Sequence, residues 1–307
     1  MRTPLPAAGS TRRGLIAAAT LALLVSGACA DAKPTSEQQR GPDPEVLIDE
    51  LTAGLSRDNP YRDPDTEERA TARRAARSLV TEPNAANDLD QVFGDLGFRA
   101  HHGTDPVTDR PFDLYLADGS DDRSWGAVLV DRGTAPRTVI EVPHPGFDIN
   151  TEKLGLAVHR KTPGSVLLVA GAHRQAADSD ADVAHNDRSL FHTLATEFAR
   201  NDLDQIQLHG FADRNLPTSD AVVSTGSAPV TPVARRIADG LSGAGLNTCR
   251  AWVRKCGQLE GKTNQQGRAA AELEAVFVHL ELSWSVRRDA EARGRVAEVL
   301  AAQLAVA

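Results

Sequence analysis

The segment RTVIEVPHPGFDINTE, residues Arg137–Glu152, indicates how most of the chain folds. Thr138–Val142 is a short apolar run rich in β-branched residues, which predicts a buried strand. Pro143 ends this strand, because proline has no N–H group to donate to a sheet. A Pro-Gly turn follows His144, and a helix is predicted to begin at Asn150 or the next residue. The sequence thus places an imidazole where a strand gives way to a helix.

From this segment to the end of the chain, short apolar strands alternate with amphipathic helices. The predicted strands are 138–142, 165–170, 205–209, 221–224 and 275–281, and the predicted helices are 151–160, 188–200, 230–241 and 286–304. Such alternation is typical of βαβ units, whose right-handed crossovers place helices on both faces of a sheet. We therefore expect an α/β core over residues 136–307, with a mostly parallel, doubly wound sheet.

Residues 45–135 are expected to pack on this core as a smaller helical and β-hairpin decoration. Glu45–Leu55 and Glu67–Leu79 have apolar residues at helical spacing. Phe112–Leu116 and Trp125–Val130 are short apolar runs that indicate a hairpin or edge strands. The histidines at positions 101 and 102 are expected in a loop, exposed to solvent.

The first 29 residues have the pattern of an export signal. Two arginines precede the apolar run Leu15–Val25, and the small residues SGACA follow. The run is too short for a comfortable membrane span. Ser26–Cys29 resembles a bacterial lipobox, which predicts a lipid on Cys29 and a place on the outer face of a bacterial membrane. The alternative is cleavage after Ala30 and secretion. Residues 30–44 lack periodicity and predict a flexible tether.

Composition and cysteine content limit the remaining possibilities. The chain is 41% hydrophobic and 25% charged, as is usual for a globular protein. Its net charge of −8 and the absence of a basic cluster with aromatics argue against nucleic-acid binding. Beyond Cys29 only Cys249 and Cys256 remain. In an exported protein such a pair suggests a disulfide, the alternative being two buried thiols.

Three of the predicted strands end in titratable residues, namely His144, His209 and Glu281. The carboxyl ends of parallel strands lie along one edge of a sheet, where ligands bind. Polar groups at buried strand ends cost desolvation unless something binds them, although a single histidine there is often only a satisfied polar residue. A Zn²⁺ ion held by two imidazoles and a carboxylate would offset that cost and lower the pKa of bound water to about 7. Glu281 would then move a proton from water to a leaving amine.

Two acids compete to be the carboxylate ligand. Asp148 lies four residues after His144, across the Pro-Gly turn. Glu152 stands in the first turn of the predicted helix, where the helix dipole favours an acid whether or not it binds a metal. The residues themselves leave both alternatives open.

Short motifs resemble those of zinc-dependent amide hydrolases. His144-Pro-Gly-Phe-Asp148 with the following Thr-Glu-Lys resembles the opening of zinc N-acetylmuramoyl-L-alanine amidases, and this resemblance implies zinc binding by His144 and Glu152. The LHG sequence around His209 looks like the strand of the second zinc histidine, and Glu281 falls where that family keeps its catalytic glutamate.

Val278–Arg287 is also similar to N-formylglutamate amidohydrolases and phage-type poly-γ-glutamate hydrolases, and Asn264–Arg268 is similar to a loop of the same group. These families share a zinc-carboxypeptidase-like fold, and in them the acid ligand follows the first histidine by only a few residues. That similarity favours Asp148. The resemblance as a whole covers about Val139–Gln303.

Two arginines are candidates for binding a substrate carboxylate. Arg174 closely follows the predicted strand 165–170, and the guanidinium of arginine can form two parallel hydrogen bonds with a carboxylate. The alternative is a surface ion pair with Asp178 or Asp180. Arg287 opens the last predicted helix, just after Glu281, and is a second candidate.

Asp182 and His185 are expected to line the site or to orient a ligand imidazole. Taken together, the sequence predicts an exported zinc hydrolase that cleaves an amide or peptide bond near a carboxylate. Its expected substrates are peptides, acyl-amino acids, γ-glutamyl polymers or peptidoglycan. The alternative is a metal-free surface lipoprotein that keeps the fold and only binds a ligand, since fold does not fix function.

Overall fold

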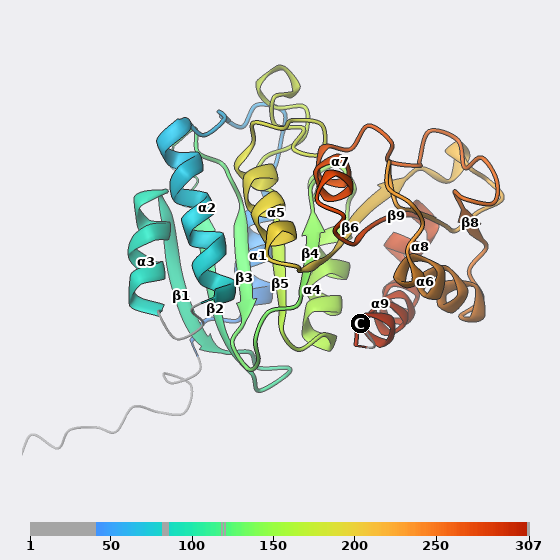
Figure 1. Ribbon diagram of the computed structural model, residues 1–307, viewed down its shortest axis with the longest axis horizontal. Helices are drawn as coiled ribbons and strands as arrows, with labels where there is room; N and C mark the ends of the chain where they lie inside the picture. Colours follow the sequence, from blue (N-terminus) through green and yellow to red (C-terminus); the bar gives the residue numbers. More distant parts are fainter. Residues whose placement is uncertain (1–40, 82–85, 118, 120, 306–307) are drawn as a thin grey trace, which may run out of the picture. The chain divides into compact units, whose positions relative to one another are not determined.

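The computed structural model describes residues 41–81, 86–117, 119 and 121–305. Within this part of the chain, nine strands form one sheet in the order β1-β2-β3-β5-β4-β6-β9-β7-β8 (Figure 1). The strands are β1 Phe98–Thr104, β2 Pro111–Ala117, β3 Ala127–Asp131, β4 Thr138–Val142, β5 Ser165–Val169, β6 Asp204–Phe211, β7 Ala221–Ser224, β8 Thr248–Arg250 and β9 Phe277–Ser283. The helices are α1 Pro44–Ala53, α2 Thr66–Thr81, α3 Ala86–Asp95, α4 Thr151–Lys161, α5 Leu190–Arg200, α6 Pro232–Gly243, α7 Gln265–Glu272, α8 Trp284–Arg288 and α9 Ala290–Leu304. The predicted α/β class is confirmed.

The sheet is mixed, which corrects the prediction of a mostly parallel sheet. Four of its eight strand pairings are parallel and four are antiparallel. The adjacent strands β5, β4, β6 and β9 are parallel, whereas β1, β2 and β3 form an antiparallel meander that extends the same sheet past β5. Short loops connect β1 to β2 and β2 to β3, and a short loop permits only an antiparallel return.

Helices cover both faces of the sheet, as predicted. Apolar residues of α1, α4, α6 and α9 form one buried cluster with alternate residues of the central strands. Helices α2, α3 and α5 form a second cluster on the opposite face. Helix α7 packs beside α5 and against β9 (Figure 1). The central strands are therefore buried on both sides.

One face of β4, β6 and β9 is unusually polar for a buried sheet. Ile206 and Leu208 of β6 join the cluster under α4 and α9, so the intervening side chains point to the α5 and α7 side. The buried polar residues on that side are Glu141, Gln205, Gln207, His209, His279 and Glu281. Alternation along each strand thus places these polar residues on one face, together with apolar residues such as Val139 of β4.

The last predicted helix is two helices, because the chain turns at Asp289. This residue has an extended backbone, with φ −91° and ψ 117°, and its carboxylate accepts from Ala292 N to cap α9. Residues 1–40, with the export signal, the lipobox cysteine and most of the tether, lie outside the described residues. No helix in the described part is long and apolar enough to cross a bilayer.

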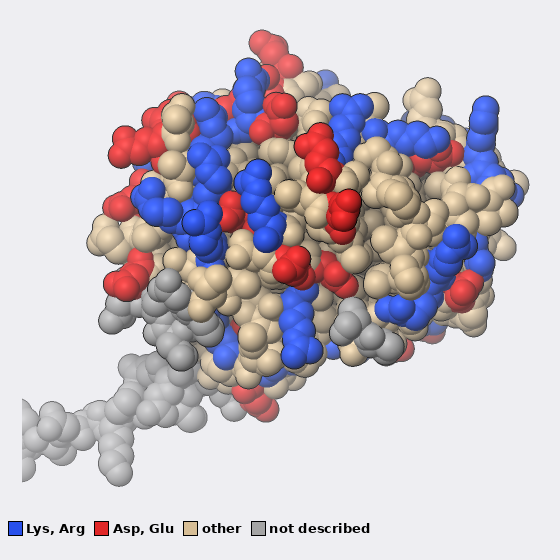
Figure 2. All heavy atoms as spheres, viewed as in Figure 1, with Lys and Arg blue, Asp and Glu red and all other residues tan. Residues whose placement is uncertain are grey.

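Surface charges are mixed on the face that Figure 2 shows. Basic and acidic side chains are interspersed over it. The sequence carries 34 Lys and Arg residues and 42 Asp and Glu residues. Interspersed charges contribute chiefly to solubility, since exposed ion pairs stabilise little.

His102 was expected in a loop, but it lies in β1 and joins three elements. Its Nδ1 is 2.6 Å from Asp113 Oδ1 in β2, and its Nε2 is 2.9 Å from Asp90 Oδ2 in α3. The sequence RAHHGT lacks an apolar run, so only pairing with β2 identifies it as a strand. Burial opposes the charged imidazole, but the bonds with Asp113 and Asp90 outweigh it and raise the pKa of His102.

We expect His102→Gln to lower the melting temperature more in acid than in alkali. A raised folded-state pKa means that the cation stabilises the fold fully below the unfolded value of about 6.5, and that this contribution is lost as pH rises through the folded value. Melting curves of both proteins between about pH 5.5 and 9 measure the difference. A difference that is constant across this range would contradict a role for the charge.

Candidate metal centre

The ends of β4, β6 and β9 lie side by side and bring the predicted residues together. Strand β6 pairs in parallel with β4 and with β9, and His209 stands directly opposite Glu281 in the register. His144 follows β4 by two residues. All three residues line one pocket of about 790 Å³, together with Asp148, Arg174, His185 and the loop 257–264.

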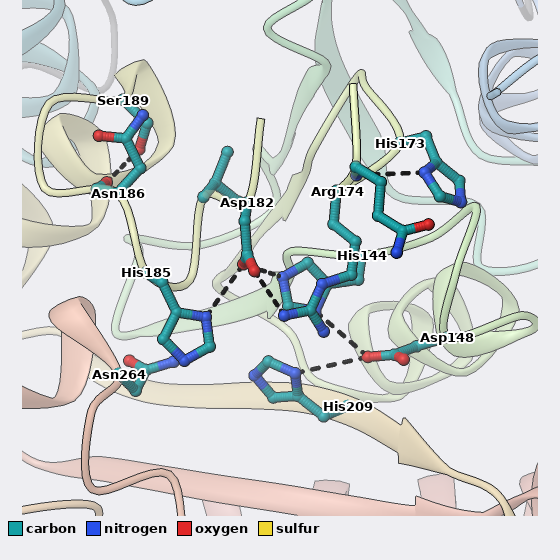
Figure 3. A network of polar contacts seen from close by, with 12 residues as sticks. His144, Asp148, His173, Arg174, Asp182, His185, Asn186, Ser189, His209 and Asn264 are labelled. Carbon is teal, nitrogen blue, oxygen red and sulfur yellow. Dashed lines mark hydrogen bonds and ion pairs between the residues drawn. The ribbon is translucent and has the colours of Figure 1, made fainter. Parts of the chain in front are cut away.

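Two imidazoles and one carboxylate oxygen converge at the floor of this pocket. Asp148 Oδ2 lies 3.3 Å from His144 Nδ1 and 3.5 Å from His209 Nδ1 (Figure 3). Both separations exceed the usual N–H···O distance of about 2.9 Å. They match the separation of about 3.4 Å between two ligand atoms of a tetrahedral zinc ion with bonds of 2.0–2.1 Å.

The opposite nitrogen of each imidazole is held by an acceptor. His144 Nε2 is 2.9 Å from Asp182 Oδ1, and His209 Nε2 is 2.6 Å from Gln207 Oε1. When Nε2 carries the proton and donates it, Nδ1 of the neutral ring presents a lone pair. Both lone pairs then point toward Asp148 Oδ2. A ligand histidine usually donates its other N–H to such an acceptor.

The electrostatics of this cluster favour a bound cation. Burial opposes ionisation of Asp148, but its contacts with the imidazoles of His144 and His209 keep the pKa of its carboxyl well below the usual range. Burial lowers the pKa of His209 to about 4, so this ring is neutral at pH 7. For His144 burial acts in the same direction, but Asp148 and Asp182 outweigh it and raise its pKa, so a metal ion at this ring would compete with a proton. A carboxylate facing two imidazole nitrogens in a buried site is the donor set that zinc prefers.

A second group of potential ligand atoms overlaps the first. It consists of His209, His279 and Glu281, whereas the first is His144, Asp148 and His209. The two share His209, whose Nδ1 lies beside Asp148 Oδ2. This contact joins His209 to the first group.

Of the two acids that the sequence left open, only Asp148 joins the histidines. The turn after His144 brings Asp148 back, because Asp148 N donates to His144 O at 2.7 Å. Asn150 then takes a left-handed conformation, with φ 71°, before α4 begins. Glu152 in α4 lines a different pocket, with Glu45 and Lys153 among others.

We expect Asp148→Asn to weaken zinc binding by about 100-fold or more, since loss of a charged ligand exceeds the 10–100-fold typical of outer-shell changes. Glu152→Gln is the matched control, with a similar loss of one buried carboxylate, and its zinc affinity is expected to match the wild type. Competition titration with a chromophoric chelator measures both constants. The reverse order of the two effects would assign the ligand to Glu152.

Arg287, a predicted substrate-binding residue, is not among the residues that line this pocket. Its side chain is buried, and its guanidinium donates to the backbone oxygens of Leu282, Ile149 and Phe211. It packs over Gly210, where a Cβ atom would lie 2.1 Å from Arg287 Nε. Arg287 instead ties β9, β6 and the turn after His144 together.

Arg174 lines the pocket and is not paired with Asp178 or Asp180. Its partner is Asp182, the carboxylate that also accepts from His144 and His185. Burial opposes ionisation of Asp182, but the bonds to the two histidines and the charge of Arg174 hold its pKa far below the usual range. Asp182 therefore contacts the imidazole of His144, and His185 contacts Asp182 (Figure 3).

Glu281 is a buried acid that faces the pocket. Its Oε2 has no hydrogen-bond partner in the described part of the chain. Burial, and then the negative charge of Asp148, raise its pKa well above the usual value. A raised pKa makes a carboxylate a stronger proton acceptor, and the same group can afterwards donate the proton to a leaving group.

His279 is a residue of the pocket that sequence reasoning missed. Its ring stacks on His209, with centroids 4.5 Å apart, and it lines the same pocket. Its Nδ1 is buried and has no partner among the described residues. The signal was present in the sequence FVHLELS, because alternation places residues 279 and 281 on one face of β9.

A disulfide anchors the loop that forms one wall of the pocket. Cys249 and Cys256 are bonded, which confirms the predicted pairing. The chain then continues into the pocket-lining residues 257–264. Ser224 Oγ donates to Glu260 O at 2.6 Å, and Cys256 N donates to Glu260 Oε1 at 2.9 Å. The disulfide therefore lies at the base of this wall.

Comparison with known proteins found similar solved structures but no similar sequence. No family model and no curated protein matches the chain. An N-formylglutamate amidohydrolase from Ralstonia eutropha JMP134 is 13% identical, over 64% of this chain and 96% of that one, with a TM-score of 0.42. A bacteriophage poly-γ-glutamate hydrolase is 19% identical, over 56% and 84%, with a TM-score of 0.38. An N-acetylmuramoyl-L-alanine amidase from Clostridium difficile 630 is 13% identical, over 56% and 97%, with a TM-score of 0.34. These are the protein types that the sequence motifs resemble.

Proposed function

We propose that the protein is a zinc-dependent hydrolase of an amide or peptide bond. The observation that carries this proposal is the approach of two imidazole Nδ1 atoms to one oxygen of Asp148, at 3.3 and 3.5 Å, beside the unpartnered carboxyl of Glu281. His144, Asp148 and His209 would hold the ion. Bound zinc would polarise a carbonyl and activate water at neutral pH.

The protein's own groups have distinct roles in such a reaction. Glu281 accepts a proton from the attacking water and donates it to the nitrogen of the leaving amine, so that water is added across the broken C–N bond. Asp182 and Gln207 hold the two imidazoles in place. Arg174 at the pocket wall attracts a substrate carboxylate, because arginine pairs well with planar anions.

The substrate proposed is an amide that carries a carboxylate close to the scissile bond. The pocket contains cationic side chains on three separate segments, namely Arg174, Arg214 and Lys262. Arg174 pairs with Asp182 and Lys262 pairs with Glu260, and cations at a pocket can still attract anionic substrates and raise their local concentration. N-acyl amino acids, γ-glutamyl peptides and cell-wall peptides all satisfy this description.

The proposal is tested by metal analysis and a substrate screen on the same preparation. The purified protein is expected to hold about one zinc per chain and to hydrolyse at least one of the three substrate groups, with loss of activity on chelation and recovery on addition of zinc. Protein that binds one of these compounds unchanged, and holds no zinc after exposure to it, would instead be a ligand-binding protein.

We also propose that residues 1–29 direct export and that Cys29 carries a lipid. The SGAC sequence after an apolar run supports this proposal. In a bacterial host the wild type is expected in the membrane fraction, and Cys29→Ser is expected in the soluble exported fraction. Release of both proteins into the medium would favour cleavage after Ala30.

A further inference from the structure

Gln207 is the centre of a buried hydrogen-bond network behind the candidate metal centre. Its Oε1 accepts from His209 Nε2 at 2.6 Å and from Asn264 Nδ2. Its Nε2 donates to Glu141 Oε2 at 2.7 Å and to Gln266 Oε1 at 3.1 Å. The amide thus uses both donors and both lone pairs, and all five side chains are buried.

Two backbone groups determine which way the amides in this network face. Gln266 Nε2 donates to Val183 O at 2.8 Å, and a carbonyl oxygen can only accept, so Gln266 presents its oxygen to Gln207. Asn264 Oδ1 accepts from Gly267 N at 2.8 Å, and a backbone N–H can only donate, so Asn264 presents its NH₂ group to Gln207. The network therefore has one consistent direction.

The direction of the network decides where the proton of His209 lies. If the Gln207 amide were reversed, its NH₂ group would face the NH₂ group of Asn264, and its oxygen would face the oxygen of Gln266. Buried groups left unpaired in this way are unfavourable. Gln207 Oε1 therefore faces His209. Because this oxygen can only accept, His209 Nε2 must carry the hydrogen of the bond between them. The lone pair on Nδ1 is then directed toward Asp148.

We propose that Gln207 is a positioning residue that fixes the tautomer of His209, with Asn264 and Gln266 transmitting its orientation from the backbone. The proposal rests on the proposed function only in taking His209 Nδ1 as a metal ligand. His144 needs no such network, because its acceptor Asp182 has two oxygens and no donor. The amide of Gln207 could in principle be reversed, so that its NH₂ group faced His209. The backbone bonds of Gln266 and Asn264 exclude that orientation.

The tautomer is measured directly in the metal-free wild-type protein. Long-range ¹H–¹⁵N correlation spectra of histidine-labelled protein distinguish a protonated Nε2 from a protonated Nδ1 for each ring. We expect the neutral His209 ring to carry its hydrogen on Nε2. A hydrogen on Nδ1 in the wild type would overturn the proposal whether or not the protein binds zinc.

Two variants of Gln207 and one matched control separate positioning from general stability. Gln207→Met keeps the shape but removes the acceptor, so we expect a mixture of tautomers and zinc affinity lower by about 10–100-fold. Gln207→Glu loses the donors to Glu141 and Gln266 but keeps an acceptor toward His209, and it is expected to retain the Nε2–H tautomer. The control is Gln205→Met, since Gln205 is buried on the same face of β6 but bonds to Ala195 O.

Each outcome tests either the positioning role of Gln207 or the proposed zinc-dependent function. An Nε2–H tautomer and wild-type zinc affinity in Gln207→Met would show that Gln207 does not position His209. Equal losses in Gln207→Met and Gln205→Met would assign the effect to packing and would likewise overturn the inference. Failure of the wild type to bind zinc, with the tautomer as expected, would instead contradict the proposed function. Should Gln207→Met not fold, the His209 tautomer measured in the wild type and in Gln207→Glu still tests the positioning role of Gln207.

Discussion

Replacing His209 with alanine is expected to abolish zinc binding and hydrolysis together. The substitution removes one of three ligands and leaves Asp148 with a single imidazole neighbour. We expect zinc affinity to fall by more than about 100-fold, beyond the range of outer-shell changes. Metal content after dialysis and the rate of substrate hydrolysis measure the two effects on one sample.

His101→Ala is the control for this experiment. His101 lies in β1, an edge strand of the sheet, and β2, β3, β5 and β4 lie between β1 and β6. Its zinc content and activity are expected to equal those of the wild type. Stoichiometric zinc in the double variant His144→Ala, His209→Ala would show that the ion is bound elsewhere, and the candidate centre would have to be abandoned.

Glu281→Gln is expected to keep the metal and lose the activity. The amide has the size of the acid but cannot carry a proton from water to a leaving amine. General acid–base catalysis typically contributes 10²–10⁴-fold, so we expect kcat/KM to fall by about this factor while zinc content stays at about one per chain. Steady-state kinetics and metal analysis on the same protein give both values.

The comparison of the two variants distinguishes a ligand from a proton carrier. His209→Ala should lose zinc, whereas Glu281→Gln should retain it, because Glu281 lies beside the three ligands and is not one of them. Undiminished turnover in Glu281→Gln would assign proton transfer to another group, and His279 on the same face of β9 would be the first candidate.

Much of the fold was predictable because strong local patterns determine it. The β-branched run 138–142 was predicted as a strand at its observed bounds, and the strand predicted at 275–281 is observed at 277–283. The position of β1 was not predictable in this way, since RAHHGT has no apolar pattern and is a strand only by pairing with β2. Antiparallel pairing at the sheet edges likewise depends on long-range contacts.

The candidate site was predictable only in part, for a similar reason. Strand ends and residue type identified His144, His209 and Glu281. The choice between Asp148 and Glu152 depended on a turn that returns the chain to His144, with Asn150 at φ 71°. Arg287 packs against Gly210, where the absence of a side chain leaves room for its guanidinium. A contact between residues so far apart in the chain is not predictable from local sequence patterns.

Anomalous X-ray scattering from crystals of the zinc-loaded protein tests the central claim most directly. Data collected above and below the zinc absorption edge are expected to give one strong peak, about 2.0–2.2 Å from His144 Nδ1, Asp148 Oδ2 and His209 Nδ1. A peak at other residues, or none in the pocket when the same protein contains about one zinc per chain in solution, would contradict the account.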